Sequence, residues 1–418
     1  MNIKIPQQKC NDLQKITPDT KLVSSNFIST TDASHKIDTV NTHPEHIKKI
    51  REKTILPVNF SWITEGGNQI ENGGRNQQQC GCCWAMATTS VLGDRYALKY
   101  NIEAPYPSVL DLVSCCGPQV FPSIPAQQQC NEGGNIYLAG KWLEKNSIGL
   151  EKCFPFQLIN VPNKYVYSNE NNIQNSYIAP TCPYNSGFTQ NDCFNCKDNK
   201  YSEGKFSVKE NSTEHVYMFN DGEYDTQATI NAIKTEIYGN GPVCTSILEP
   251  CSPGCKVSEF NSWWNENADT DKIYVPSYPP STNLGHGIVI VGWGVQDGID
   301  YWIIRNSWGI PYGKKAGICR IAMSTSTPHS NWIGIDVPIT INGNTYGGVV
   351  SFLPGELRPD DKTYWSEGNG LKPSGISWKQ PSSVNRIINN LQYQFKIHNI
   401  KPIYALIVFI VFIIILII

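Results

Sequence analysis

The sequence lacks a net charge of either sign. Its 34 Lys and Arg residues nearly balance its 36 Asp and Glu residues, so the formal net charge is −2 over 418 residues. Domains that bind nucleic acid usually carry a clustered positive charge, because the partner is a polyanion. The composition therefore gives no electrostatic reason to expect a nucleic-acid partner.

Two further absences concern targeting and metal binding. The chain begins Met1-Asn2-Ile3-Lys4-Ile5-Pro6 without an apolar stretch, so an ordinary secretory signal peptide is not expected. Cys193 and Cys196 form a C-x-x-C pair, but no second pair or cluster of His follows it. A zinc site needs more ligands at close spacing, so we interpret this pair as part of a disulfide-tied surface loop. Neither a metal nor another cofactor is expected.

Cysteine, in contrast, is abundant. The chain has 15 Cys, a number typical of a disulfide framework formed in oxidising surroundings, and the odd count fits one thiol kept apart for chemistry. An apolar content of 40% supports a sizeable core. Oxidising surroundings conflict with the missing signal peptide. An internal membrane system, or the membrane of a virus assembling in the cytoplasm, is the hypothesis that reconciles the two.

The C-terminus ends in a continuous apolar run. Residues 403–418 contain no charge and follow Lys396, His398 and Lys401. As a helix the run is about 24 Å long, short of the ~30 Å hydrocarbon core of a bilayer, so neighbouring residues or a thin bilayer would have to complete it. We predict a single C-terminal transmembrane helix over residues 401–418, with the rest of the chain on the cytoplasmic side. A buried core helix and a glycolipid-anchor signal are the alternatives.

A candidate nucleophile lies in the stretch RNQQQCGCCW, residues 75–84. Its polar turn leads into a predicted helix from Cys83 to about Lys99, one face of which should pack into the core. A thiol at a helix N-terminus faces unpaired backbone N–H groups and the positive end of the helix dipole, which favours the thiolate. Gln77 can aim an amide N–H at the oxygen of a carbonyl that Cys83 attacks.

Two later stretches supply a base and a group that orients it. His286 lies at the start of the apolar run LGHGIVIVGWG, residues 284–294, which is typical of a buried strand. Asn306 follows the next predicted strand in YWIIRNSWG, residues 301–309. In an antiparallel pair the side-chain oxygen of Asn306 can hold one imidazole nitrogen of His286. Trp308 can then cover that hydrogen bond.

These three stretches, in this order, resemble the papain-like cysteine proteases over roughly residues 55–340. The resemblance implies an α+β fold of two lobes, a helical left lobe and an antiparallel, β-barrel-like right lobe. It also implies a monomer that hydrolyses protein or peptide substrates. Carried over by motif, Cys83 is the nucleophile, His286 the base, Asn306 its orienter and Gln77 the oxyanion-hole donor. Gly133 and Gly134 fall where a substrate backbone lies flat against the cleft.

Within the family, four stretches are most similar to the cathepsin Z branch. They are TTSVLGDR (residues 88–95), EGGN (132–135), GWG (292–294) and YWIIRN (301–306). That resemblance implies a short propeptide whose Cys10 bonds Cys83 and keeps the zymogen latent; an unpaired Cys in a disordered tail is the alternative. Only Gln78 and Gln79 separate Gln77 from Cys80, so the His-containing loop with which cathepsin Z grips a C-terminal carboxylate is absent. Endopeptidase and carboxypeptidase action both stay open.

The domain organisation and the disulfides follow from the same comparison. We expect a propeptide-like segment over residues 1–53, a catalytic domain over 54–345, a polar linker over 346–400 and the anchor over 401–418. The family resemblance implies that Cys80 pairs with Cys130, and that either Cys115 or Cys116 pairs with Cys153. An amphipathic helix is predicted over residues 225–238, capped by Asp225 or Thr226 and ended by Gly239.

Two other functions use the same residues. Cys80 and Cys83 form a C-x-x-C pair at a helix start, as in thiol–disulfide oxidoreductases, but that function leaves His286, Asn306 and Trp308 without a role. A catalytically inactive papain-like binding protein is the second alternative. Cys82 stands where the family usually has Ser beside the nucleophile, and it can either trap Cys83 in a bond or tune it.

Overall fold

The computed structural model describes residues 56–356 except Asn72, Gln79 and residues 121–132, 152–155, 157–158, 163–174, 179–205, 221–222, 250–257, 280–284, 310–316 and 342–343. Cys10, the expected propeptide, residues 357–400 and the apolar C-terminal run therefore lie outside the described residues. Within the described part of the chain, no helix is long and apolar enough to cross a membrane.

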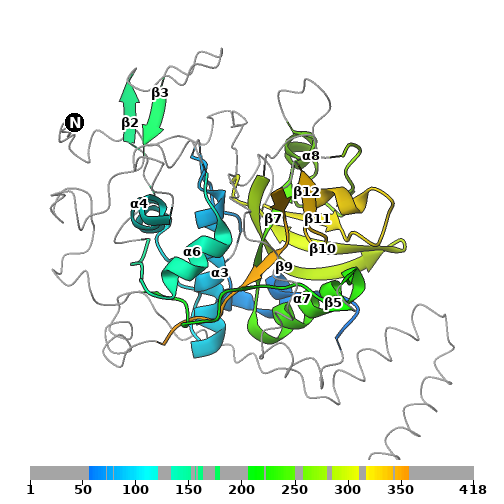
Figure 1. The fold of residues 1–418 in the computed structure, drawn as a ribbon, viewed down its shortest axis with the longest axis horizontal. Coiled ribbons are helices and arrows are strands. Elements are labelled where there is room, and N and C mark those ends of the chain that lie inside the picture. Colours follow the sequence, from blue (N-terminus) through cyan, green and yellow to red (C-terminus); the bar gives the residue numbers. More distant parts are fainter. Residues whose placement is uncertain are drawn as a thin grey trace, which may run out of the picture.

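Helices α3 (Cys83–Tyr100), α4 (Val109–Val120) and α6 (Ile136–Leu143) lie on one side of the molecule, and the large sheet lies on the other together with α7 (Thr226–Asn240) and α8 (Glu259–Asn267) (Figure 1). The fold also contains the helix α2 (Trp62–Glu65) and the short 3-10 segments η2 (Gly67–Gln69) and η4 (Ser330–Ile333). Helices α3, α4 and α6 form the left lobe, and a sheet with α7 and α8 forms the right lobe. The expected α+β arrangement of two lobes is thus present.

The right lobe is built on an eight-stranded sheet in the order β4-β14-β7-β9-β10-β11-β8, with β1 also paired to β9. Its strands are β1 (Phe60–Ser61), β4 (Glu214–His215), β7 (Val243–Leu248), β8 (Ile273–Tyr274), β9 (Gly285–Gln296), β10 (Ile299–Arg305), β11 (Ile318–Ala322) and β14 (Val349–Ser351). Three small ribbons complete the strands: β2 (Ile159–Pro162) with β3 (Asn175–Ile178), β5 (Phe219–Asn220) with β6 (Glu223–Tyr224), and β12 (Ile339–Ile341) with β13 (Asn344–Tyr346). All pairs in the large sheet are antiparallel except β11 with β8. The described strands form an open path from β4 to β8, not the barrel-like closure that the family resemblance implied.

Strand β14 corrects the expected end of the catalytic domain. It pairs with both β7 and β4, and Phe352 directly after it is fully buried. Residues 348–355, which the composition assigned to the linker, therefore pack against the fold. Their few apolar side chains form no sustained pattern in the sequence. The strand is defined by its place in the sheet, where it lies between β4 and β7.

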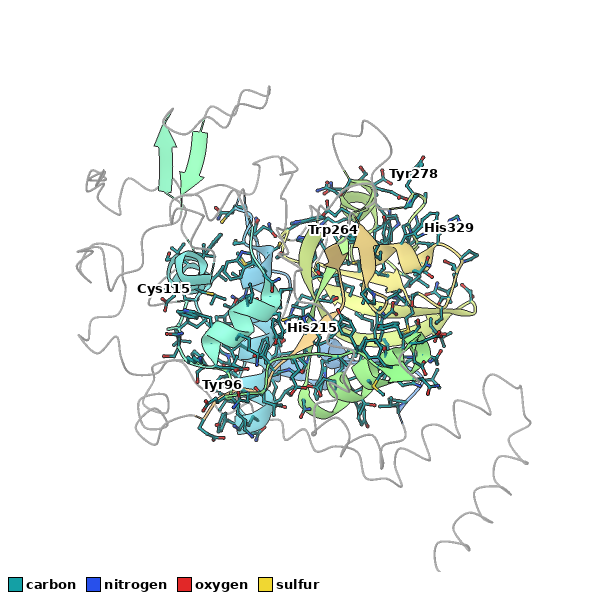
Figure 2. All side chains as sticks on the ribbon, viewed as in Figure 1. Tyr96, Cys115, His215, Trp264, Tyr278 and His329 are labelled. Carbon is teal, nitrogen blue, oxygen red and sulfur yellow. The ribbon has the colours of Figure 1, made fainter. Side chains whose placement is uncertain are left out.

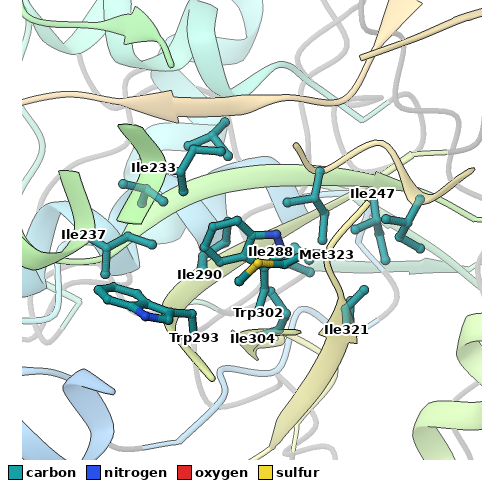
Figure 3. Close-up of a cluster of buried hydrophobic side chains, with 14 of the residues drawn as sticks. Ile233, Ile237, Ile247, Ile288, Ile290, Trp293, Trp302, Ile304, Ile321 and Met323 are labelled. Atoms are coloured by element: carbon teal, nitrogen blue, oxygen red, sulfur yellow. The ribbon is translucent and has the colours of Figure 1, made fainter. Parts of the chain in front are cut away.

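Each lobe has its own apolar core. The right-lobe core lies between α7 and the sheet and includes Ile233, Ile237, Ile288, Trp293 and Trp302 (Figure 3). Helix α7 begins after Asp225, whose side chain accepts a hydrogen bond from the Ala228 N–H, as the capping pattern predicts. It ends at Asn240 with Gly241 as its C-cap, not at Gly239, because Gly241 is the residue that adopts a positive φ of 104°.

Helix α3 lies between the two lobes. Every residue from Cys83 to Ala97 is buried, because the left-lobe helices cover one side of α3 and strand β9 covers the other. The structure thus buries more of this helix than the one face predicted from the sequence. The position of α3 brings residues from both lobes to its N-terminus.

Candidate functional site

Cys83 is the first residue of α3 and is 4% exposed. Strand β9 approaches it so closely that a Cβ on Gly287 would lie 3.0 Å from the Cys83 carbonyl carbon and 3.0 Å from the Trp84 nitrogen. Burial raises the pKa of the Cys83 thiol to about 11, although hydrogen bonds from the backbone N–H groups of Gly287 and Trp84 act in the opposite direction. The N–H group of Trp84 at the helix N-terminus lowers this pKa, as the sequence predicts, but desolvation outweighs it and favours the neutral thiol.

His286 lies on β9, one residue before Gly287, and is 3% exposed. Its Nε2 is 2.6 Å from the side-chain oxygen of Asn306, so Nδ1 is the nitrogen left for proton exchange. Strands β9 and β10 pair antiparallel, with Arg305 opposite Val289, and this register brings Asn306 beside His286. Trp308 stacks on the imidazole with a centroid distance of 4.3 Å and an angle of 22° between the planes.

The protonation state of His286 follows from its burial. Burial lowers the pKa of His286 to about 4, while the hydrogen bond to Asn306 raises it in part. At neutral pH the site therefore holds a neutral imidazole next to a neutral thiol. Such a pair can generate the thiolate by proton transfer to His286 when an electrophile arrives.

Gln77 reaches the site through backbone pairing between two loops. The Gln77 N–H donates to the Ser307 carbonyl at 2.8 Å, and the Gly309 N–H donates to the Arg75 carbonyl at 2.8 Å. The Gln77 side-chain oxygen accepts from the Ser307 hydroxyl at 2.7 Å, and its amide nitrogen donates to the Cys80 carbonyl at 3.0 Å. An amide has two N–H donors, so this hydrogen bond to Cys80 uses only one of them.

The two predicted glycines lie next to the residue that follows the nucleophile. Both are buried, and Gly133 has a positive φ of 76°. A Cβ on Gly134 would lie 2.4 Å from the indole ring of Trp84, so only glycine fits there without displacing the ring. The structure thus places this segment against the start of α3.

The cysteines separate into bonded and free groups. Cys80 and Cys115 are disulfide-bonded, while Cys82, Cys83, Cys116, Cys244 and Cys319 are free and buried. Cys115 on α4 (Figure 2) is therefore the disulfide partner that the sequence left open between Cys115 and Cys116. The expected partners Cys130 and Cys153, like the C-x-x-C pair at 193–196, lie outside the described residues.

A buried ionic network behind the site escaped the sequence analysis. Arg305, which directly precedes Asn306, donates to the Asp94 carboxylate on α3 at 2.5 Å and to the Ser90 hydroxyl at 2.7 Å. It also donates to the Glu71 carbonyl at 2.8 Å. These contacts join β10 to α3 across the two lobes. Charged residues inside an otherwise apolar helix were the available signal, because such residues are almost never fully buried unless they are paired.

A second ion pair holds the loop that carries Gln77. The Arg75 guanidinium donates to both carboxylate oxygens of Glu71, at 2.8 and 3.0 Å. Burial would raise the pKa of Glu71, but the charges of Arg75 and Arg305 outweigh it and lower that pKa. Glu71 therefore stays ionised and ties the loop, Arg75 and the interlobe network together.

The activity should fall only when the pH decreases to about 4, the pKa of His286. For a substrate with uncharged side chains, we expect kcat/KM to rise as the pH increases through about 4, because His286 must be neutral to accept the thiol proton. A pH–rate profile measures this limb, and His329→Ala, which changes a histidine far from the site in the sequence, should leave it unchanged. An acid limb near the ordinary imidazole pKa of ~6.5 would contradict the inferred desolvation of His286.

No metal centre accompanies these residues. Across the described residues, no group of three or more His, Cys, Asp and Glu side chains is arranged to hold a metal ion. The chemistry available here consists of a thiol, backbone N–H donors beside its sulfur, and an imidazole oriented by an amide.

Comparison with known proteins gives a consistent family. Residues 56–336 match the model described as papain family cysteine protease. The chain is 28% identical over 305 residues to "Cathepsin B-like cysteine proteinase 3" of Caenorhabditis elegans, covering 70% of this chain and 64% of that protein. It is 27% identical over 282 residues to "Cathepsin Z" of Onchocerca volvulus, covering 64% of this chain and 71% of that protein.

These matches leave the branch of the family open. The identities to the cathepsin B-like and cathepsin Z relatives differ by one percentage point, so they support the narrower similarity to cathepsin Z only weakly. Among solved structures, "proCathepsin B S9 from Trypanosoma congolense" matches with a TM-score of 0.45 and 18% identity, covering 73% of this chain and 80% of that one. The chain spans somewhat less than two thirds of the length of the first cathepsin B-like relative.

Proposed function

Because the chain belongs to the papain family of cysteine proteases, we propose that it hydrolyses peptide bonds through Cys83, His286, Asn306 and Gln77. The observation that carries the proposal is the 2.6 Å hydrogen bond between His286 and Asn306, stacked under Trp308 and adjacent to the Cys83 helix. Contacts between residues 77 and 307, 287 and 83, and 286 and 306 support bringing these residues from separate stretches of the chain to one site.

The proposed reaction has two stages. His286 takes the Cys83 proton as the sulfur attacks the scissile carbonyl carbon, and the resulting oxyanion accepts hydrogen bonds from Gln77 and from the Cys83 N–H. Collapse of this intermediate breaks the C–N bond, and His286 returns the proton to the leaving amine, which leaves a thioester. Water, deprotonated by His286, then attacks the thioester and releases the acid and the thiol.

The disulfide state of Cys80 bears on the oxidoreductase alternative. A C-x-x-C redox centre would cycle a bond between Cys80 and Cys83. In this structure Cys80 is bonded to another cysteine while Cys83 is free. That pattern, together with the paired His286 and Asn306, favours acyl transfer over thiol–disulfide exchange.

Gln77→Ala tests the oxyanion role. We expect kcat to fall by ~10²–10³, because one of the two donors to the oxyanion is lost while Cys83 and His286 stay in place. The neighbouring Gln78→Ala is the matched control and should change kcat little, since Gln78 is not among the residues that pair with Ser307. The measurement is the hydrolysis rate of one peptide amide substrate by both variants. Equal rates would contradict the oxyanion role of Gln77.

Two parts of the proposal concern residues outside the described ones. Cys83 is free in this structure, so a Cys10–Cys83 bond would belong to a separate, latent zymogen form, and a helix over residues 401–418 would tether the enzyme to a membrane. Peptide mapping of the unreduced chain should find the Cys10–Cys83 cross-link, and protease protection on intact membranes should report the tether and its orientation. A latent chain without this cross-link would contradict the proposed role of Cys10.

A further inference from the structure

An acidic side chain outside the proposed machinery stands near Cys83. Strand β7 pairs antiparallel with β9, with Ile247 opposite His286 and Leu248 opposite Gly285. Glu249 directly follows Leu248, the last residue of β7, so its backbone lies at the same end of the sheet as His286. Diagonal neighbours across an antiparallel pair lie about 7–8 Å apart, a distance that the long Glu249 side chain can span toward the imidazole of His286.

The surroundings of Glu249 restrict the position of its side chain. It is half-buried and accepts a hydrogen bond from the hydroxyl of Ser258, the residue that caps α8. Helix α8, which carries Trp264 (Figure 2), packs its aromatic rings on Trp308, with centroid distances of 5.6 Å from Phe260 and 6.3 Å from Trp264. Glu249 is also close enough to Cys83 to act on the charge of its sulfur.

This location is on the leaving-group side of the scissile bond. His286 Nε2 is bonded to Asn306, so its Nδ1 gives the proton to the leaving amine, and the first residue of the leaving fragment must lie beside this ring. One residue spans about 3.5 Å, so its side chain and its own carboxyl end are both within reach of the face that carries Glu249. Gly134 lies against Trp84, the residue that follows Cys83 on α3.

We propose that Glu249 selects the first residue on the leaving-group side: it favours a cationic side chain there and disfavours a free C-terminal carboxylate, which makes the enzyme an endopeptidase. This inference rests on the proposed protease function. Its physical basis is that a carboxylate in a partly desolvated cleft attracts a Lys or Arg side chain and repels a second carboxylate at the same distance. It addresses the choice between endopeptidase and carboxypeptidase that the missing His-containing loop leaves open.

The charge of Glu249 depends on pH. Burial raises its pKa to about 7, while the Ser258 hydrogen bond acts in the opposite direction. The Glu249 charge acts on Cys83 and on Tyr274, and Glu259 also acts on Tyr274. None of these groups, nor His286, is cationic at neutral pH. The carboxylate form predominates above pH 7, so selectivity should be strong at pH 8 and weak at pH 5.5.

The experiment uses the full chain with a thiol reductant and peptides that differ only in the residue after the scissile bond. One set carries Lys, Ala or Glu there within a longer, amidated peptide. A second set ends at that residue with either a free carboxylate or an amide. At pH 8 we expect kcat/KM to fall at least tenfold from Lys to Glu and at least tenfold from amide to carboxylate.

Glu249→Gln removes the charge and should reduce both ratios to about threefold or less, while Glu266→Gln, an equal change at an exposed position of α8, should retain them. Mass analysis of the products verifies the cleaved bond. Hydrolysis with unchanged ratios in Glu249→Gln, or a wild type that releases single C-terminal residues efficiently, would overturn this inference and leave the protease function intact. A chain that cleaves none of the peptides would overturn both.

Discussion

Replacing Cys83 with Ala should abolish peptide hydrolysis, with kcat/KM lower by about 10⁶-fold. Losses of this size follow when an acyl-transfer enzyme is deprived of its nucleophile, because its catalytic groups act as a unit and the oxyanion donors alone leave only residual activity. The fold should survive, since the substitution removes one sulfur atom from a residue whose backbone starts α3. The rate measured with one peptide amide substrate checks the activity, and the denaturant midpoint checks the fold.

Cys116→Ala is the matched control, because Cys116 is also a free, buried cysteine but lies on α4. Its activity should equal that of the wild type. An electrophilic thiol reagent should label Cys83 in the wild type and lose that selectivity in His286→Ala, since no base would remain to generate the thiolate. Rapid labelling without hydrolysis would favour an inactive binding protein, and full activity in Cys83→Ala would leave no role for this site.

Replacing Asp94 with Leu should lower the free energy of unfolding by ~3–5 kcal/mol. The change removes the carboxylate that is hydrogen-bonded to the buried Arg305 guanidinium, and arginine cannot escape the cost by losing its proton. Asp94 also accepts a hydrogen bond from the Glu71 N–H at 2.7 Å, and that donor would lose its partner as well. Because Arg305 precedes Asn306, we also expect lower activity through displacement of the His286–Asn306 pair. Urea denaturation and the rate with one peptide substrate measure the two effects.

The surface ion pair between Asp271 and Arg320 provides the control. Its two side chains are 85% and 25% exposed, so Asp271→Leu should cost no more than ~1 kcal/mol. A double variant, Asp94→Leu with Arg305→Met, should recover part of the lost stability. Burial raises the pKa of Asp94 to about 6 in spite of Arg305, which indicates that the desolvation of this carboxylate is costly. Equal effects of Asp94→Leu and Asp271→Leu would show that the interlobe pair contributes no more than a surface pair.

The sequence alone was sufficient where chemistry depends on residue type and local pattern. The Cys83 helix start, the Asp225 cap and the β9–β10 strand pair all follow from short-range rules on capping, periodicity and apolar runs. The ordered motifs also indicated the family that the comparison with known proteins identified. Local rules could not decide that α3 is buried on all sides, because this depends on which lobe covers each face.

The tertiary structure alone decided those features that depend on long-range contacts and on desolvation. The helix N-terminus at Cys83 favoured a thiolate, but burial between the lobes raises the thiol pKa to about 11. Strand β14 joined the sheet although its residues show no strand pattern, and Cys115 rather than Cys116 entered a disulfide. The sequence itself determined which groups are available for catalysis. The tertiary fold determined their charge and their neighbours, because dielectric surroundings and strand pairing arise from residues hundreds of positions apart.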